Sequence, residues 1–296
     1  MISLCFIYFK ALNIKQSKMD ESKCNASDVF CHGQLLDTIQ QSGIYPDSKT
    51  FVDMHMLMNP ETVLKDFDEL MKQGQPTVEA IRSFVQDHFD GPGGELEVWI
   101  PEDWSENPEL LQRIKDPSIN QFARSLNDLW KILGRKVLPM NHPERYSLIP
   151  VPYPFIIPGD RFREFYYWDT YWIIGGLLAV DMTQTARGML YNLLHTVDRY
   201  GFVPNGGRIY YMNRSQPPLL IPMIDLYFER TRNIDFIQQN IYGMEKEYNF
   251  WIENRTIKVK GPSGTEHAMA IYRVQSTEPR PEGYVADLDA IQDLSG

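Results

Sequence analysis

The sequence is poor in cysteine, in basic residues and in long apolar runs. It holds three cysteines in 296 residues, and 29 Lys and Arg stand against 39 Asp and Glu, a formal net charge of −10 at pH 7. Because an acidic chain repels phosphate backbones, we expect no nucleic-acid partner. Apolar runs of eighteen residues are absent from the sequence, so no membrane-spanning segment is predicted.

Metal chemistry is not favoured either. The six histidines are scattered and form no HExxH or comparable pairing, whereas a structural zinc site normally takes four Cys or His ligands. We therefore predict no metal site.

Three features favour an oxidising compartment. Cys24 and Cys31 are close enough in sequence to close a small disulfide loop. The N-terminal residues 1–9 are largely apolar, although no basic region precedes them and no small-residue cleavage site is obvious. N-glycosylation sequons begin at three residues: Asn25, Asn213 and Asn254. We expect a secreted or cell-surface glycoprotein.

Apolar residues make up 43% of the chain, enough for a sizeable core, and their spacing is mostly helical. Strand alternation is confined to residues 96–100, and Pro-rich loops occupy 151–159 and 216–222. Helices are predicted from Asn59-Pro60 through 70, from Thr77 through 85, over 122–133 with Gly134 as the stop, from a Thr183 cap to Gly201, and over 234–252. The fold class predicted is all-α with long loops.

One loop combines rings and charges in an unusual way. Residues 158–171 read PGDRFREFYYWDTY, with six aromatic and five charged residues. A partly exposed helix start with internal Arg–Glu pairs would account for this composition. Alternatively, the loop binds a polyhydroxylated ligand, because sugars stack their C–H faces on rings and pair their hydroxyls with carboxylates and guanidinium groups.

Two later loops repeat this chemistry. Residues 205–218 supply an amide, two arginines, tyrosine rings and a Ser-Gln pair, and residues 277–282 place Arg280 and Glu282 two positions apart on a Pro-stiffened backbone. Three such loops together indicate a carbohydrate cleft.

The first of these loops resembles a signature of the α,α-trehalases, a family of glycoside hydrolases, which runs PGGRFxExYxWDxY. Nine of its ten fixed positions match between Pro158 and Tyr171. The exception is Asp160, where the family has Gly. If that position needs a positive φ, Asp is among the less costly replacements, although it adds a negative charge beside Arg161.

The resemblance continues in residues 47–54, 201–206, 214–218 and 279–282, and covers about 31–285. It implies an (α/α)6 toroid of the six-hairpin glycosidase type, incomplete in this chain, with residues 1–30 as a leader or extension, 31–285 as a partial catalytic domain and 286–296 as a divergent tail. It also implies trehalose as the substrate and no cofactor. The implied substrate-binding residues are Arg161, Trp168, Asp169, Asn205, Arg214, Ser215, Gln216, Arg280, Pro281 and Glu282.

The catalytic pair that the resemblance implies is not found in the sequence. Family members invert the anomeric carbon with an Asp acid in an ESGWDxS-like motif and a Glu base nearer the C-terminus; neither motif occurs here, nor does QWDxPxGWxP. The resemblance therefore places the acid and the base beyond Gly296, and no catalytic residue is predicted within the 296 residues. We expect a truncated product that is catalytically impaired. A non-catalytic sugar-binding fragment or splice product, and a different all-α glycosidase, are the alternatives.

Overall fold

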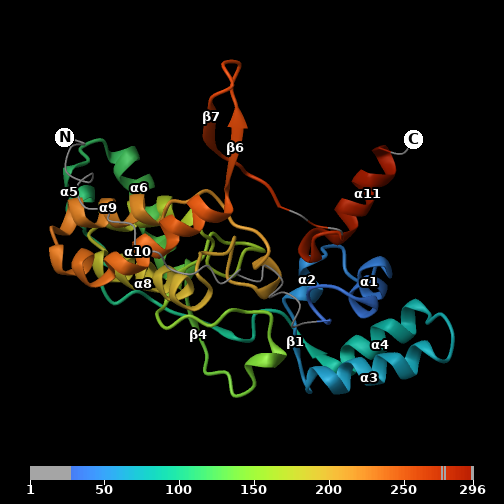
Figure 1. Cartoon of the computed structure of the whole chain (residues 1–296). Helices are drawn as coiled ribbons and strands as arrows, with labels where there is room; N and C mark the ends of the chain where they lie inside the picture. Colours follow the sequence, from blue (N-terminus) through green and yellow to red (C-terminus); the bar gives the residue numbers. More distant parts are fainter. Residues whose placement is uncertain (1–27, 275, 277, 295–296) are drawn as a thin grey trace.

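The computed structural model describes residues 28–274, 276 and 278–294, and helices dominate this part of the chain (Figure 1). The all-α prediction is confirmed. The helices are α1 (Gln34–Gln41), α2 (Lys49–Val52), α3 (Pro60–Met71), α4 (Val78–His88), α5 (Glu109–Arg113), α6 (Pro117–Leu133), α7 (Asp169–Ala179), α8 (Thr183–Tyr200), α9 (Leu220–Thr231), α10 (Ile234–Asn254) and α11 (Tyr284–Leu294), with short 3-10 turns η2 (Pro143–Arg145), η3 (Ile209–Tyr211) and η4 (Pro281–Gly283).

Strands are short and all pair antiparallel. They are β1 (His55–Met56), β2 (Phe89–Asp90), β3 (Leu96–Val98), β4 (Gly134–Val137), β5 (Phe155–Ile156), β6 (Thr256–Lys260) and β7 (Glu266–Ala270). The β6–β7 hairpin projects from the body of the molecule (Figure 1). Among the described residues, no helix is both long and apolar enough to cross a bilayer.

Helix starts follow local capping in some places and distant contacts in others. The Thr77 hydroxyl accepts from the Ala80 amide at 3.2 Å, as expected for the first residue before α4. Helix α8 differs from the prediction: Thr183 is already helical and caps nothing. Instead Asp103, eighty residues earlier, accepts from the backbone amides of Gln184 and Thr185 at 2.8 and 2.9 Å. At the other end, Gly201 closes α8 at φ 90°, as predicted.

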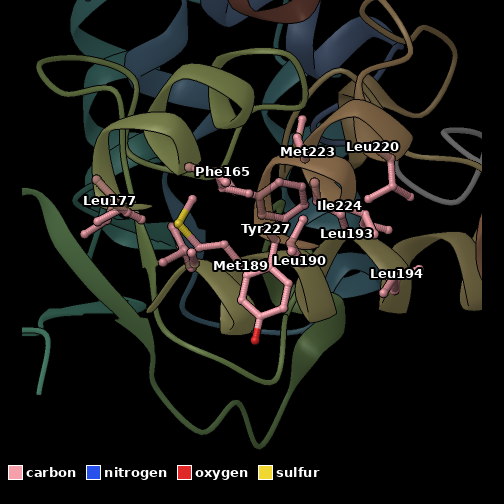
Figure 2. Packing of buried hydrophobic residues seen from close by; sticks show 14 of the residues in the cluster. Phe165, Leu177, Met189, Leu190, Leu193, Leu194, Leu220, Met223, Ile224 and Tyr227 are labelled. Atoms are coloured by element: carbon pink, nitrogen blue, oxygen red, sulfur yellow. The ribbon is translucent and has the colours of Figure 1, made fainter. Parts of the chain in front are cut away.

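The larger core lies among α7, α8, α9 and α10 (Figure 2). Aliphatic residues from one face of α8 meet Tyr227 and Ile224 of α9, and Phe165 joins them from the loop before α7. The apolar stripe predicted for 183–200 is therefore a true core face. This packing anchors the loop that carries the signature segment.

A second core gathers α1 to α4 and the β1–β2 pair. Val29 and Phe30 are fully buried in it, with Phe30 against the rings of Phe51 and Phe89. The folded region thus includes residues before position 31, which the sequence analysis assigned to an extension. Tyr166, Tyr210 and Tyr211 also belong to this core, so the signature segment touches both cores.

Helix α6 has the predicted period, and most of its apolar stripe is exposed. Asp116 caps it through the amides of Ser118 and Ile119, and Pro117 occupies its first position. Its apolar stripe is largely exposed, with Phe122 at 65%. The larger exposed side chains of α6 are Ile119, Phe122, Leu126, Leu129 and Ile132. Periodicity predicted the helix, but an apolar stripe does not by itself identify what covers it.

Glu247 is an acid buried on α10. Tyr167 of the signature segment donates a hydrogen bond to its carboxylate, and the Leu220 amide donates to the same tyrosine hydroxyl at 3.2 Å. Burial raises the pKa of Glu247 to about 7, and the hydrogen bond from Tyr167 opposes that rise. The folded state therefore favours the protonated acid.

Replacing Glu247 with glutamine should relieve a penalty that grows as pH rises from about 4.5 to about 7. A folded-state pKa above the unfolded one means that stability is complete at low pH and falls as pH rises toward 7. From pH 4 to pH 8 the free energy of unfolding of E247Q should gain roughly 3 kcal/mol relative to the wild type. Urea titrations at both pH values measure it. E245Q, at an exposed site on the same helix, is the control. If the free energy of unfolding changed with pH in the same way in the wild type, E247Q and E245Q, the prediction would be contradicted.

Candidate functional site

A cavity of about 870 Å³ lies where four separate segments meet. Its size falls within the range of small-molecule sites. The lining residues come from the turn before α2, the signature segment, the loop around η3, and η4 with α11: Pro46, Asp47, Ser48, Pro158, Arg161, Phe162, Tyr166, Trp168, Asp169, Asn205, Tyr211, Arg214, Gln216, Arg280, Glu282, Gly283, Val285, Ala286 and Asp289.

The structure brings eight of the ten predicted binding residues to this cavity. They are Arg161, Trp168, Asp169, Asn205, Arg214, Gln216, Arg280 and Glu282. The other two lie behind it. The buried Ser215 hydroxyl donates to the Val203 carbonyl at 2.7 Å, and the carbonyl of buried Pro281 accepts from the Gln40 side chain at 3.0 Å. In this structure both residues stabilise the loops that carry their neighbours.

Glu282 and Arg214 form the centre of the polar wall. Arg214 Nη2 donates to Glu282 Oε1 at 2.5 Å, and both side chains are only 13% exposed. The guanidinium also lies over the Tyr211 ring, 5.1 Å from its centroid. Glu282 Oε2 is buried and has no hydrogen-bond partner among the described residues. This oxygen is therefore an acceptor that a hydroxyl donor from a ligand would satisfy.

Trp168 and Gln216 both line the cavity and are hydrogen-bonded to each other. The Trp168 backbone amide donates to Gln216 Oε1 at 2.9 Å, while the indole is 41% exposed and lies edge-on to Trp172. The next residue, Asp169, is the first of α7, where the helix dipole favours a carboxylate. Burial nevertheless raises the pKa of Asp169, and a hydrogen bond with Gln216 acts against that rise.

Two tyrosines connect the cavity to the charges beneath it. The hydroxyls of Tyr166 and Tyr211 are 2.9 Å apart, and Tyr166 donates to Glu164 Oε1 at 2.5 Å. Burial and the nearby Glu164 carboxylate raise the pKa of both phenols, so both stay protonated. The cavity wall thus includes two neutral phenols, whose hydroxyls are held by hydrogen bonds to each other and to Glu164.

The charges under the tyrosines form what we call the buried ion cluster: Lys49, Asp53, Glu95, Glu164 and Arg208. Lys49 Nζ donates to Asp53 at 2.6 Å and to Glu164 at 2.7 Å, and Arg208 is 2.8 Å from Glu95. Burial opposes ionisation of Glu164, yet Arg208 and Lys49 prevail and lower its pKa. At Asp53 burial prevails and raises the pKa.

Asp160 occupies the tight turn that aims Arg161 at the cavity. Its φ is 55°, in the left-handed region, and the Phe162 amide closes the turn on the Gly159 carbonyl at 3.1 Å. The position therefore has the positive φ that explains a family preference for glycine. Arg161 pairs with Asp47 instead of with its neighbour.

Restoring glycine here should stabilise the chain modestly. D160G removes a side chain from a left-handed backbone, and we expect a gain of about 0.5 kcal/mol in free energy of unfolding, measured by urea denaturation. D160N is the control, because it removes the charge and keeps the backbone strain; it should match the wild type. A D160G protein less stable than D160N would contradict the prediction.

Several lining residues were not assigned a ligand role by sequence reasoning, among them Asp47, Tyr211 and Asp289. Asp287 does not line the cavity, but it pairs with Arg280, which does. Asp287 and Asp289 lie in α11, within the segment that the sequence analysis treated as a divergent tail. Asp287 could have been predicted from its position in the sequence: it lies in the first turn of α11, seven residues after Arg280, which precedes the helix.

The predicted modification sites are described only in part. Cys31 is disulfide-bonded, but Cys24 and Asn25 lie outside the described residues. Asn213 and Asn254 both line a smaller cavity of about 250 Å³, and the Asn254 side chain donates to the Phe250 carbonyl at 3.0 Å.

Two further predictions concern the catalytic pair and metal ions. Gly296, beyond which the resemblance places the catalytic acid and base, lies outside the described residues, which end at Leu294. The position of that pair therefore stays a prediction from the sequence. Within the described ranges, no cluster of three or more His, Cys, Asp or Glu could hold a metal ion.

The helical scaffold and its cavity define an all-α protein with a polar, ring-flanked pocket suited to a polyhydroxylated ligand. Residues 43–295 match the trehalase family model. The chain belongs to the trehalase family, whose members are (α/α)6 toroids. The match extends beyond residue 285, where the sequence analysis ended the resemblance, and includes α11.

Known trehalases are similar over most of this chain. Identity is 50% with trehalase from Apis mellifera, 47% with that from Oryctolagus cuniculus and 43% with that from Homo sapiens, over 88%, 90% and 98% of this chain. The chain spans 42%, 47% and 50% of those relatives' lengths, about half. Among solved structures, the neutral trehalase from Saccharomyces cerevisiae is 30% identical, with a TM-score of 0.40 over 47% of this chain and 26% of that one.

Proposed function

We propose that this chain carries the sugar-binding site of an α,α-trehalase, an enzyme that hydrolyses trehalose to two glucose molecules with inversion, and that the cavity binds one glucose unit. The observation that carries the proposal is convergence: Arg161, Arg214 and Arg280 come from three separated segments and line one cavity. Guanidinium groups suit vicinal hydroxyls because their donors lie in one plane with fixed spacing.

The remaining groups have complementary roles in this proposal. The exposed face of Trp168 offers an apolar platform for the C–H face of a pyranose, as aromatic rings do in polar pockets. Glu282 Oε2 accepts from a sugar hydroxyl, which supplies the partner that it lacks among the described residues. Asn205 adds an amide that both donates and accepts.

We also propose that the 296-residue chain binds trehalose without hydrolysing it. An inverting pair flanks the scissile bond with carboxyl groups about 6.5–9.5 Å apart. Of the cavity carboxylates, Asp47 and Glu282 are engaged with Arg161 and Arg214, which favours a binding role over proton transfer. The motifs that the family uses for its acid and base are absent from this sequence.

Calorimetric titration of the folded chain with trehalose, with glucose release assayed in parallel, tests both statements. We expect saturable binding and no glucose. Maltose and sucrose are the comparison sugars, since preference for either would indicate a different helical glycosidase. A chain that is folded by circular dichroism but shows no heat with trehalose would overturn the proposal, and glucose release would overturn the binding-only role.

A secretory route is part of this proposal. The disulfide at Cys31 supports an oxidising compartment, and the three sequons agree with passage through one. We therefore propose a secreted or cell-surface glycoprotein.

A further inference from the structure

Two of the three cavity arginines form salt bridges with aspartates that lie outside the sugar-binding motifs. Arg161 donates to Asp47 through Nε at 2.7 Å and through Nη2 at 2.5 Å. Arg280 donates to Asp287 through Nε at 2.9 Å and through Nη2 at 2.5 Å. Both pairs are bidentate, the geometry that fixes the plane of a guanidinium group as well as its position.

Each aspartate is itself held by backbone. Asp47 precedes α2, and its Oδ1 also accepts from the Lys49 amide at 3.0 Å. Asp287 lies in α11, and its Oδ2 also accepts from the Arg280 amide at 2.8 Å. The two carboxylates are therefore held in place by backbone amides before any ligand binds. Their bidentate pairs in turn restrict the positions of the two arginine side chains.

The two pairs use the same edge of each guanidinium group. In both, Nε and Nη2 are engaged, and Arg161 Nη2 makes a further contact with the Glu282 carbonyl at 3.2 Å. For both arginines, Nη1 makes no hydrogen bond to the residues that the structure describes. Nη1 of each arginine, with its two N–H donors, is thus left without a partner among the described residues, and both arginines line the cavity.

We propose that Asp47 and Asp287 are positioning residues of the trehalose site: they hold Arg161 and Arg280 so that Nη1 of each is presented to the sugar hydroxyls. This inference rests on the proposed function. Its physical basis is that an unpaired arginine loses rotamer entropy when it binds a ligand, and that ordering by an aspartate removes this entropy before binding. Burial acts to raise the pKa of Asp47, but the hydrogen bond from Arg161 and other favourable contacts lower it overall. At Asp287 the hydrogen bond from Arg280 is the main cause of a lowered pKa, and burial again acts against it.

The test compares trehalose affinity in D47N, D287N and D181N. Asparagine keeps the shape and removes one of two strong acceptors, so D47N and D287N should each weaken binding about tenfold, and the double variant about a hundredfold, since the two pairs share no atoms. Asp181 forms an Asp–Arg pair with Arg230 away from the cavity, and D181N should bind as the wild type does.

A double-mutant cycle separates positioning from a general structural effect. If Asp47 acts through Arg161, then R161M and R161M/D47N should bind trehalose equally weakly. Exchange of the Arg161 Nε proton, followed by NMR, gives a readout that needs no ligand, and D47N should accelerate it. Wild-type affinity in D47N and D287N, with binding by the wild type intact, would overturn this inference alone. Absence of trehalose binding by the folded wild type would overturn the proposed function with it.

Discussion

Replacing Lys49 with methionine is expected to destabilise the protein by about 3–5 kcal/mol. Lys49 is 2% exposed and donates to Asp53, Glu164 and the Tyr210 hydroxyl, at 2.6, 2.7 and 3.1 Å. Methionine fills a similar volume but removes the charge, which leaves two buried carboxylates with Arg208 as the main compensating cation. Urea denaturation monitored by circular dichroism measures the loss.

The control is the exposed pair between Lys65 and Glu69 on α3, whose side chains are 74% and 58% exposed. K65M should change the free energy of unfolding by less than about 1 kcal/mol, because solvent screens such a pair. Equal effects of K49M and K65M would show that the buried ion cluster contributes little to the fold.

The second large effect is on binding. Replacing Arg214 with methionine should weaken trehalose binding about 30-fold or more, because it removes a cation and leaves the largely buried Glu282 carboxylate without its partner. The loss should exceed that of D47N, which leaves all three arginines in place. Calorimetry with trehalose is the measurement.

Arg163 provides the matched control, since it belongs to the signature segment but does not line the cavity described above. Its Nη1 lies 3.5 Å from the Pro92 carbonyl. R163M should bind trehalose with nearly wild-type affinity. If R163M and R214M lost affinity to the same extent, the cavity would not be the binding site.

Sequence reasoning succeeded where the determining contacts are local. The Thr77 cap and the Gly201 stop are decided within one helical turn, so residue type and spacing predict them. The start of α8 could not be predicted in this way, because its capping carboxylate, Asp103, is far away in the chain. Likewise, the period of α6 predicts a helix but cannot identify which residues, if any, cover Phe122.

The same distinction applies to the cavity. Resemblance identified the motif residues, and eight of the ten predicted meet there. It did not identify Asp47 as the partner of Arg161, since a salt bridge between positions 114 apart has no sequence period. Asp287 was missed for another reason: it lies only seven positions from Arg280, but in the segment that was expected to be a divergent tail. Ser215 and Pro281 lie inside matching motifs, yet their hydrogen bonds place them behind the wall.

The cavity has a consequence for synthesis on the ribosome. Its polar wall joins Asp47 to Arg161 across 114 positions, and Tyr284 of α11 donates to Asp37 of α1 across 247. Contacts of such long range form late, after the loop between them has closed. A nascent chain therefore has no complete pocket until α11 has emerged from the exit tunnel, and ligand present at that stage would stabilise only chains whose two distant ends have already met.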